Sequence, residues 1–266
     1  MSATLMKPSE NTELAAVRRR RIAEQVVARG AMTLRELCDH FGVSDATMRR
    51  DLQTLEEGGR IARTHGGAIK TSSVLVDLPN EQRKSIGADE KRRIGRAAIN
   101  LLRGDEVVFL DAGTTAHAVA VEAARKPACT YVTTSLGIAN TLQSLAIDKF
   151  YLIGGSYEPI NDSFAGSLAV AALRALSFDV AFICCSAIDL ESRSISVASE
   201  AYSQVQKEVM SISRKNYVIA DASKFRSSAF MRTATFSQIS GVITNRELGQ
   251  DSLDVLRETD LDLVLA

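Results

Sequence analysis

The most constraining feature of the sequence is a pair of short amphipathic helical patterns, separated by a tight turn, within residues 33–57. Thr33 and Glu36 have the spacing of a capping box, in which each side chain bonds a free amide at the start of a helix. Gly42 begins a short turn, and Ser44 is a favourable N-cap for the helix that follows. We therefore expect two consecutive helices joined by a tight turn.

The second of these helices, residues 45–57, divides into an apolar and a polar face. Met48, Leu52 and Leu55 recur at i, i+4 and i+7, which places them on one inward stripe. The outward side carries Thr47, Arg49, Arg50 and Gln53. Arginine binds guanine edges and phosphates through its planar fork. The pattern predicts a helix-turn-helix that binds double-stranded DNA, and a small helical bundle with a charged surface is the alternative.

Flanking segments complete a domain that we place at residues 13–70, after a flexible tail of residues 1–12. A helix is expected over residues 13–29, and two short β segments around a glycine turn within residues 61–69 would form a wing near the DNA backbone. The candidate DNA-binding residues are Thr33, Ser44, Thr47, Arg49, Arg50, Gln53, Arg63 and His65.

The charge balance agrees with this division. The whole chain of 266 residues has 32 basic and 32 acidic residues, and this neutral sum on its own argues against nucleic acid. Residues 1–70, however, carry 12 Lys+Arg against 9 Asp+Glu, so the positive excess coincides with the expected helix-turn-helix. No segment has the length of a membrane span and no apolar stretch follows the basic N-terminal cluster, which predicts a cytoplasmic protein. The four cysteines have no metal-ligand spacing, so reduced thiols, no metal and no cofactor are expected.

The rest of the chain predicts an α/β domain. Residues 71–88 resemble a linker in composition, and a helix from residue 89 would place Ile94, Ala98 and Leu101 on one face. Apolar segments then alternate with helical ones, which is typical of a mostly parallel sheet over residues 89–266. The expected strands are residues 107–110, 131–133, 150–153, 180–184, 217–220, 242–244 and 261–265.

Ligands of parallel sheets bind beyond the carboxyl ends of the strands. The loop at residues 111–115 offers a glycine, two threonine hydroxyls and the amides of a helix start, which together favour a phosphate. Asp111 would hold the loop amides or bind a sugar hydroxyl. Loops at residues 133–135, 154–155 and 221–225 follow other strands, and Lys224 could supply a point charge. The candidate effector-binding residues are Asp111, Gly113, Thr114, Thr115, Thr134, Ser135, Gly154, Gly155, Lys207, Asp221 and Lys224.

Residues 34–52 resemble the helix-turn-helix signature of DeoR-family bacterial transcriptional regulators, and residues 63–68 resemble the end of that DNA-binding domain. The similarity continues at Glu90, Lys91, residues 111–115, 132–135, Gly154, Gly155, Gly166, residues 182–183, Lys207 and residues 221–225. It implies a C-terminal domain similar in fold to ribose-5-phosphate isomerase that senses a phosphorylated sugar or polyol. The leading hypothesis is a repressor, and symmetry favours an even-numbered homo-oligomer, a homodimer or a homotetramer.

The chain departs from the family's pattern at four positions, Thr134, Cys184, Ala187 and Asn245. The family usually has Asn at the first, glycine at the second and third, and Asp at the last. A side chain at Cys184 or Ala187 would crowd a ligand that approaches the backbone there.

Two other classes of function remain open at this point. A sugar-phosphate isomerase with an accessory DNA-binding segment would use Asp111, Asp189 or Asp221 as its base, although none of them stands in a catalytic motif. A dinucleotide-binding protein is the weaker alternative, because no G-x-G-x-x-G follows the first strand.

Overall fold

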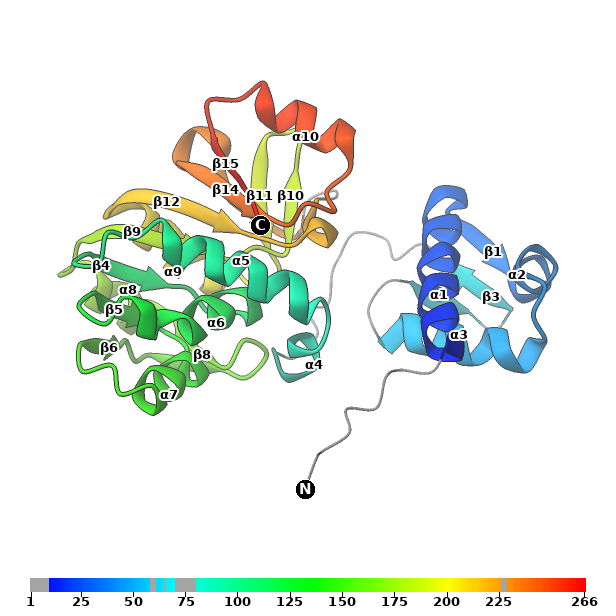
Figure 1. Cartoon of the computed structure of the whole chain (residues 1–266), viewed down its shortest axis with the longest axis horizontal. Coiled ribbons are helices and arrows are strands. Elements are labelled where there is room, and N and C mark those ends of the chain that lie inside the picture. Colours follow the sequence, from blue (N-terminus) through cyan, green and yellow to red (C-terminus); the bar gives the residue numbers. More distant parts are fainter. Residues whose placement is uncertain (1–9, 58–60, 65, 70–79, 226–228) are drawn as a thin grey trace. The chain divides into compact units, whose positions relative to one another are not determined.

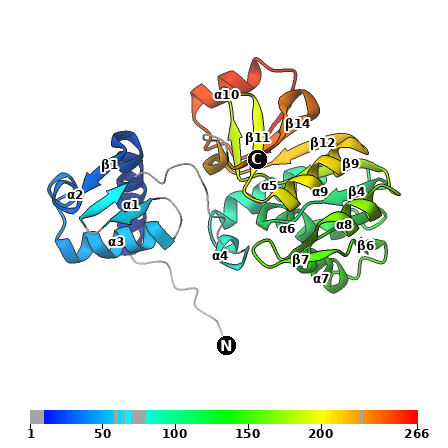
Figure 2. The same ribbon diagram turned by 180° about the vertical axis from the view of Figure 1, so that it is seen from behind.

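A computed structural model describes residues 10–57, 61–64, 66–69, 80–225 and 229–266. Its internal contacts divide the chain into two compact units, Met1–Val76 and Asp77–Ala266. Each unit is a separate folded body, and Figures 1 and 2 show both from opposite sides.

The first unit is a three-helix bundle with a small antiparallel sheet. Its elements are α1 (Glu10–Arg29), β1 (Ala31–Thr33), α2 (Leu34–Phe41), α3 (Asp45–Glu57), β2 (Ala62–Thr64) and β3 (Gly67–Ile69). The strands lie in the order β1-β3-β2, so the expected two-stranded wing is present and gains β1 as a third strand. The helix-turn-helix and wing predicted from the sequence are confirmed.

The capping box that defines the start of α2 is present. The backbone amide of Glu36 donates to the Thr33 hydroxyl at 3.2 Å, and the amide of Thr33 donates to the Glu36 carboxylate at 2.7 Å. α2 ends at Gly42, whose φ of +65° suits glycine and whose amide bonds the carbonyl of Cys38. The expected inward stripe of α3 is buried against α1 in a core that contains Ile22, Val26, Leu37, Met48, Leu52 and Leu55.

Two boundaries differ from the expected domain limits. α1 begins at Glu10, inside the expected tail of residues 1–12, of which residues 1–9 lie outside the described residues. The helix α4 (Asn80–Lys84) and the first residue of α5 (Ala88–Asn100) fall within the expected linker of residues 71–88. The amide of Asn80 donates to the carbonyl of Ile160 at 2.8 Å, so residues 80–88 pack as part of the second unit. Residues 71–79 lie outside the described residues.

The second unit is built on a seven-stranded sheet in which every neighbouring pair is parallel. The strand order is β15-β14-β12-β9-β4-β5-β6. The strands are β4 (Val107–Leu110), β5 (Thr130–Thr133), β6 (Phe150–Leu152), β9 (Phe178–Ile183), β12 (Ser213–Ile219), β14 (Gly241–Thr244) and β15 (Asp262–Leu265). These correspond to the seven segments predicted as strands, and the expected parallel α/β class is confirmed.

Helices cover both faces of this sheet. They are α5, α6 (Thr114–Val121), α7 (Leu136–Ser144), α8 (Ser167–Leu173), α9 (Glu200–Ser211) and α10 (Gln250–Arg257), with 3₁₀ turns at Ala123–Arg125, Ala222–Lys224 and Phe236–Gln238. Alternate strand residues enter different cores, as with Val108 and Leu110 on the α5–α7 side and Phe109 on the α8–α10 side. In the described part of the chain, no helix is long and apolar enough to cross a membrane.

Short antiparallel strands were not anticipated by the sequence. They form the hairpin β7 (Ser156–Glu158) and β8 (Ser163–Ala165), and a sheet of β10 (Ala187–Asp189), β11 (Ser194–Val197) and β13 (Met231–Thr235). The end of α5 also differs from expectation. The helix stops at Asn100, so Leu101 is 40% exposed, and Ile99 and Leu102 are the buried residues in its place.

Candidate functional sites

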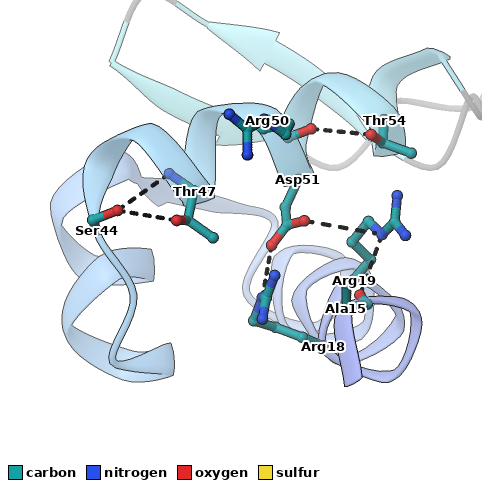
Figure 3. Close-up of polar contacts among 8 residues, drawn as sticks. All are labelled: Ala15, Arg18, Arg19, Ser44, Thr47, Arg50, Asp51 and Thr54. Carbon is teal, nitrogen blue, oxygen red and sulfur yellow. Dashed lines mark hydrogen bonds and ion pairs between the residues drawn. The ribbon is translucent and has the colours of Figure 1, made fainter. Parts of the chain in front are cut away.

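The outward face of α3 carries the predicted recognition side chains. Arg49, Arg50 and Gln53 are exposed, and Thr47 is half-buried. The hydroxyl of Ser44 lies 3.0 Å from that of Thr47 and accepts from its amide at 3.4 Å, which caps the helix start (Figure 3). The face therefore presents two guanidinium groups on a helix whose N-terminus is fixed.

The opposite side of α3 is held by a buried carboxylate. Asp51 is 5% exposed and accepts from the Nε atom of Arg18 at 2.7 Å, and the Nε atom of Arg19 lies 3.9 Å from its other oxygen (Figure 3). Both arginines belong to α1. Because α3 is fixed to α1 on this side, Arg49 and Arg50 remain on its solvent side.

Three other candidate DNA-binding residues lie around this helix. Arg63 on β2 is exposed, its amide donates to Glu56 at 3.0 Å, and its guanidinium lies 3.8 Å from the same carboxylate. The exposed Thr33 already uses its hydroxyl in the capping box. His65 lies outside the described residues.

In the second unit, the connection between strands reverses direction between β4 and β9. From β4 the chain continues outward to β5 and β6, and it then returns to β9 on the other side of β4. The loops after β4 and β9 therefore diverge at this switch point, which is where parallel α/β sheets bind ligands, and we call this sheet edge the crevice. Asp111 begins the first of these loops and Cys184 begins the second.

The side chain of Asp111 fastens the two diverging loops together. It is fully buried and accepts from the amides of Ala112 and Cys184, each at 2.8 Å. The Nε2 atom of Gln206 on α9 donates to it at 2.6 Å, and the Tyr202 hydroxyl bonds the carbonyl of Ala112. Burial raises the pKa of Asp111 to about 6 against the lowering effect of these donors. Asp111 therefore holds loop amides, as expected from the sequence.

Gly113 is required by the shape of the loop. Its φ is +150°, and an added Cβ would lie 3.0 Å from the Sγ atom of Cys184. The departure at Cys184 therefore places a thiol directly against the loop, and burial raises the pKa of that thiol. α6 begins at Thr114, so Thr114 and Thr115, which were expected in the loop, lie in its first turn. The first turn of a helix carries amides without partners inside the helix, and here the amide of Ala116 interacts with the Cys184 thiol.

The loop after β5 adds buried hydroxyls to the same edge. Ser135 is the N-cap of α7 and accepts from the amide of Ile138 at 3.3 Å. It also forms a backbone bridge with Ser163. Thr134 and Ser163 are fully buried, and neither hydroxyl has a hydrogen-bond partner among the residues that the structure describes. Buried hydroxyls of this kind are uncommon and mark a place for a polar ligand or water.

The loop after β12 holds its candidates by local bonds. The carboxylate of Asp221 accepts from the amide and hydroxyl of Ser223, and Lys224 is half-buried in the turn that follows. Asn245, where the family usually has Asp, accepts from the amide of Ala222 at 2.8 Å and so supports the loop. Ala187 is buried in β10, where it pairs with Ser196.

Three other candidate effector residues are Gly154, Gly155 and Lys207, and they have different surroundings. A Cβ on Gly155 would lie 2.5 Å from the carbonyl of Ala165, so this glycine permits close packing against β8, whereas Gly154 is exposed with open space beside it. Lys207 is exposed on α9, where it lines a surface depression of about 430 Å³. That depression is formed by Ser167, Val170, Arg174, Gln204, Lys207, Glu208 and Ser211, all on or at the end of α8 and α9. The residues of α9 that reach the crevice are Gln206 and Tyr202.

Sequence reasoning missed two cationic side chains at the crevice, Arg83 and Lys91. Lys91 is 6% exposed in the first turn of α5, and the charges of Asp221 and Lys224 act on it. Its position in the sequence contained a signal, because it precedes the buried Ile94 by three residues on the apolar stripe of α5. Among the described residues, no group of three or more His, Cys, Asp or Glu side chains could hold a metal ion.

Comparison with known proteins agrees with this two-domain arrangement. The DeoR-like helix-turn-helix domain matches residues 18–74, and the DeoR C terminal sensor domain matches residues 87–246. The transcriptional repressor AccR of Agrobacterium fabrum is 33% identical over 84% of each chain. The L-fucose operon activator of Haemophilus influenzae is 30% identical over 92% of this chain and 97% of its own.

Among solved structures, ribose 5-phosphate isomerase A from Methanocaldococcus jannaschii is similar with a TM-score of 0.40 and 16% identity, over 53% of this chain and 55% of the isomerase.

A helix-turn-helix unit joined to a parallel α/β unit with a polar crevice defines the class of DNA-binding transcriptional regulators. The chain belongs to the DeoR family of these regulators. The matched relatives are regulators and not enzymes, which confirms the choice of a regulator over an isomerase.

Proposed function

We propose that this regulator is a repressor of carbohydrate or polyol catabolism genes, and that a phosphorylated sugar or polyol bound in the crevice of the second unit modulates its binding to operator DNA. The observation that carries the proposal is the convergence at one sheet edge of a helix start, unpartnered buried hydroxyls and cationic side chains. Each of these features favours an anionic, oxygen-rich ligand.

Relatives support the two halves of this proposal separately. AccR is a repressor by name, and the L-fucose activator is named for a sugar operon. One of these relatives is named a repressor and the other an activator, so an experiment on this chain must distinguish repression from activation. A reporter gene under the native operator should rise in expression when this regulator is deleted. Lower expression would instead identify an activator.

We also propose that the regulator binds as a homodimer or homotetramer, because paired half-sites require paired recognition helices. Large apolar side chains of the second unit support self-association. Tyr151 on the edge strand β6, Tyr157 on β7 and Leu168 on α8 are 62%, 51% and 73% exposed. A mass measurement by light scattering tests this, and a monomer at micromolar concentration would contradict it.

Arg49 and Arg50 are the proposed base- or phosphate-contacting residues, together with Thr47 and Gln53. Substitution Arg50→Ala should weaken operator binding by about 1–3 kcal/mol at fixed salt, the usual value of a specific arginine contact. Arg92→Ala is a matched control because Arg92 is an exposed arginine on α5 of the other unit. Equal operator affinity of both variants would contradict the assignment of Arg50.

The effector proposal is tested by thermal unfolding of the purified chain with a panel of phosphorylated sugars and polyols and their unphosphorylated counterparts. A phosphorylated compound should raise the midpoint, and its parent sugar should raise it less, because binding to the folded state stabilises that state. Thr114→Ala combined with Lys224→Ala should abolish the shift. An equal shift in the double variant would refute the site at these loops.

A further inference from the structure

The thiol of Cys184 lies at the start of α6, where the loops after β4 and β9 meet. A Cβ added to Gly113 would lie 3.0 Å from the Sγ atom of Cys184, so the sulfur already fills the space beside that glycine. The amide of Ala116, in the first turn of α6, interacts with the same sulfur. The amides of a first helical turn are also where an anionic group binds. The thiol therefore occupies a position that part of a ligand could otherwise take.

Cys184 faces the crevice, whereas the adjacent cysteine does not. The Cys184 residue is partly exposed, and it packs against the core on the α5–α7 side of the sheet. Cys185 is buried in the core on the α8–α10 side. The two thiols thus lie on opposite sides of the sheet, so Cys185 provides an internal control for the role of Cys184.

Gln206 on α9 contributes a free acceptor next to Cys184. Its Nε2 atom donates to the carbonyl of Cys184 and to the carboxylate of Asp111, each at 2.6 Å. Both partners are acceptors, so the amide nitrogen must face them and the amide cannot turn over. The Oε1 atom is buried and has no hydrogen-bond partner within the described residues. A buried acceptor without a donor is costly, so this oxygen favours a hydroxyl group from outside the chain.

Neither of these two groups carries a charge near neutral pH. Burial raises the pKa of the Cys184 thiol, which therefore stays protonated, and the Gln206 amide does not titrate. A neutral surface with a free acceptor favours the hydroxyl-bearing part of a ligand over its phosphate. The thiol also keeps a phosphate away from the amide of Ala116, and it leaves the hydroxyls of Thr114 and Thr115 in the same turn to the ligand.

We propose that Cys184 and Gln206 determine which ligand the crevice accepts. The thiol limits the group that fits at the start of α6, and the Oε1 atom of Gln206 accepts a hydrogen bond from a ligand hydroxyl. This inference rests on the proposed effector site and assigns its specificity to two residues. The class of ligand that fits is a compact phosphate ester with free hydroxyl groups, and an ester of the same shape without them should bind less well.

A purely structural role is the competing explanation. Cys184 packs against a core and Gln206 holds Asp111, so either substitution could change the stability of the second unit without affecting a ligand. A buried water could also supply the donor that Gln206 lacks. A change in stability moves the unfolding midpoint without ligand, but it leaves unchanged the ratio of the affinities of one variant for two ligands. That ratio therefore separates the two roles.

The experiment measures thermal unfolding of the full chain in inorganic phosphate, glycerol 2-phosphate and isopropyl phosphate at equal ionic strength. The two esters share a carbon skeleton and differ only in their hydroxyl groups. Wild type should bind glycerol 2-phosphate about tenfold more tightly than isopropyl phosphate, as expected for one hydrogen bond to a buried acceptor. Gln206→Met should lose most of this preference.

The cysteine variants test the other half of the proposal in inorganic phosphate. Cys184→Ala should bind phosphate about tenfold more tightly than wild type, because the amide of Ala116 becomes available for a charge-assisted hydrogen bond. Cys184→Ser keeps a hydroxyl that can bond this amide, so its affinity should stay close to that of wild type. Cys185→Ala is the matched control and should bind phosphate as wild type does.

The outcomes separate this inference from the effector site on which it rests. If wild type binds both esters equally, or if Gln206→Met keeps the preference, the role given to Gln206 is wrong. If Cys184→Ala binds phosphate no more tightly than wild type, the thiol does not limit the site. Either result contradicts this inference and leaves the effector site intact, whereas no stabilisation of wild type by any of the three compounds contradicts both. Should Gln206→Met fail to fold, the wild-type preference and the Cys184 variants decide.

Discussion

The Nε atom of Arg18 on α1 lies 2.7 Å from a carboxylate oxygen of Asp51 on α3. The Asp51 side chain is 7% exposed and that of Arg18 is 25% exposed, so the pair lies at the interface of the two helices. Arg50, the residue before Asp51, is exposed to solvent. Asp51 thus fixes α3 to α1, and the preceding residue, Arg50, is on the exposed side of the helix.

The ion pair predicts that Asp51→Ala lowers the free energy of unfolding of the first unit by about 2 kcal/mol, the value of a hydrogen bond to a charged group. Asp51→Asn should lose less, because its amide oxygen can still accept from Arg18. Glu24→Ala is the control, since the Arg20–Glu24 pair is largely exposed and should contribute well under about 1 kcal/mol. Chemical denaturation measures all three. Equal losses in Asp51→Ala and Glu24→Ala would contradict the role given to the buried carboxylate.

Gly113→Ala should destabilise the second unit by about 1–3 kcal/mol, because an alanine would have to adopt a φ of +150°. The new Cβ would also lie 3.0 Å from the Sγ atom of Cys184. Adding Cys184→Ala removes the sulfur but not the backbone strain, so the double variant should recover only part of the loss. Full recovery in urea unfolding would mean that the steric contact alone requires glycine.

Asp111 predicts a stability change at mildly acidic pH. Its pKa in the folded protein is about 6, above the ordinary 3.8, so between these values the folded chain holds a proton that the unfolded chain has released. The contribution of Asp111 to the free energy of unfolding should therefore fall, by about 3 kcal/mol, as the pH rises from about 4 to about 6. Unfolding of wild type and Asp111→Asn across this range gives the difference. A difference that stays constant or grows with pH would show that the hydrogen bonds outweigh burial.

Lys91 predicts that phosphate binding weakens in mild alkali. Burial lowers its pKa to about 8, with Asp221 opposing and Lys224 and Arg83 reinforcing that shift, while the Cys184 thiol beside it stays protonated. The ammonium is therefore lost as the pH rises through about 8, although phosphate keeps its full charge. Lys91→Arg should bind phosphate with little change over this range, because arginine remains protonated. The same decline in both proteins would assign the titration to another group.

Without ligand, the free energy of unfolding should change with pH in the opposite direction. Between about 8 and 10.5 the unfolded chain holds a proton on Lys91 that the folded chain has released, so the contribution of Lys91 to the free energy of unfolding should rise with pH. This opposite trend separates ligand binding from stability.

The sequence predicted those parts of the fold that depend on local chemistry. Helix α2 follows from its capping box with Thr33 and Glu36 and from the glycine that ends it, and the seven sheet strands follow from apolar segments between helices. The strands β10, β11 and β13 were missed because they are only three to five residues long, and because the pairing of β11 with β13 joins segments far apart in sequence.

The sequence predicted the part of the candidate site that directly follows a strand. The loop at Asp111 and Gly113 follows a strong strand, so its place at the sheet edge could be inferred. Arg83 and Lys91 lie on helices before the first strand of the sheet, and charged helical residues are usually solvated. Only the packing of α4 and α5 against the crevice places them there. The sequence predicted Lys207 at the site, but its buried neighbour Gln206 makes the contact with Asp111. Helix boundaries inferred from sequence do not determine which of two adjacent residues points inward.

The central claim is that a ligand in the crevice controls binding of DNA by α3. The most direct measurement is the fluorescence anisotropy of a labelled operator with the full-length wild-type protein, titrated at fixed salt with the phosphorylated compound that gives the largest thermal shift. The account predicts a progressive change in operator affinity for wild type, and no change for Thr114→Ala with Lys224→Ala, which should still bind operator. A compound that stabilises the wild-type protein but leaves its operator affinity unchanged would contradict the account.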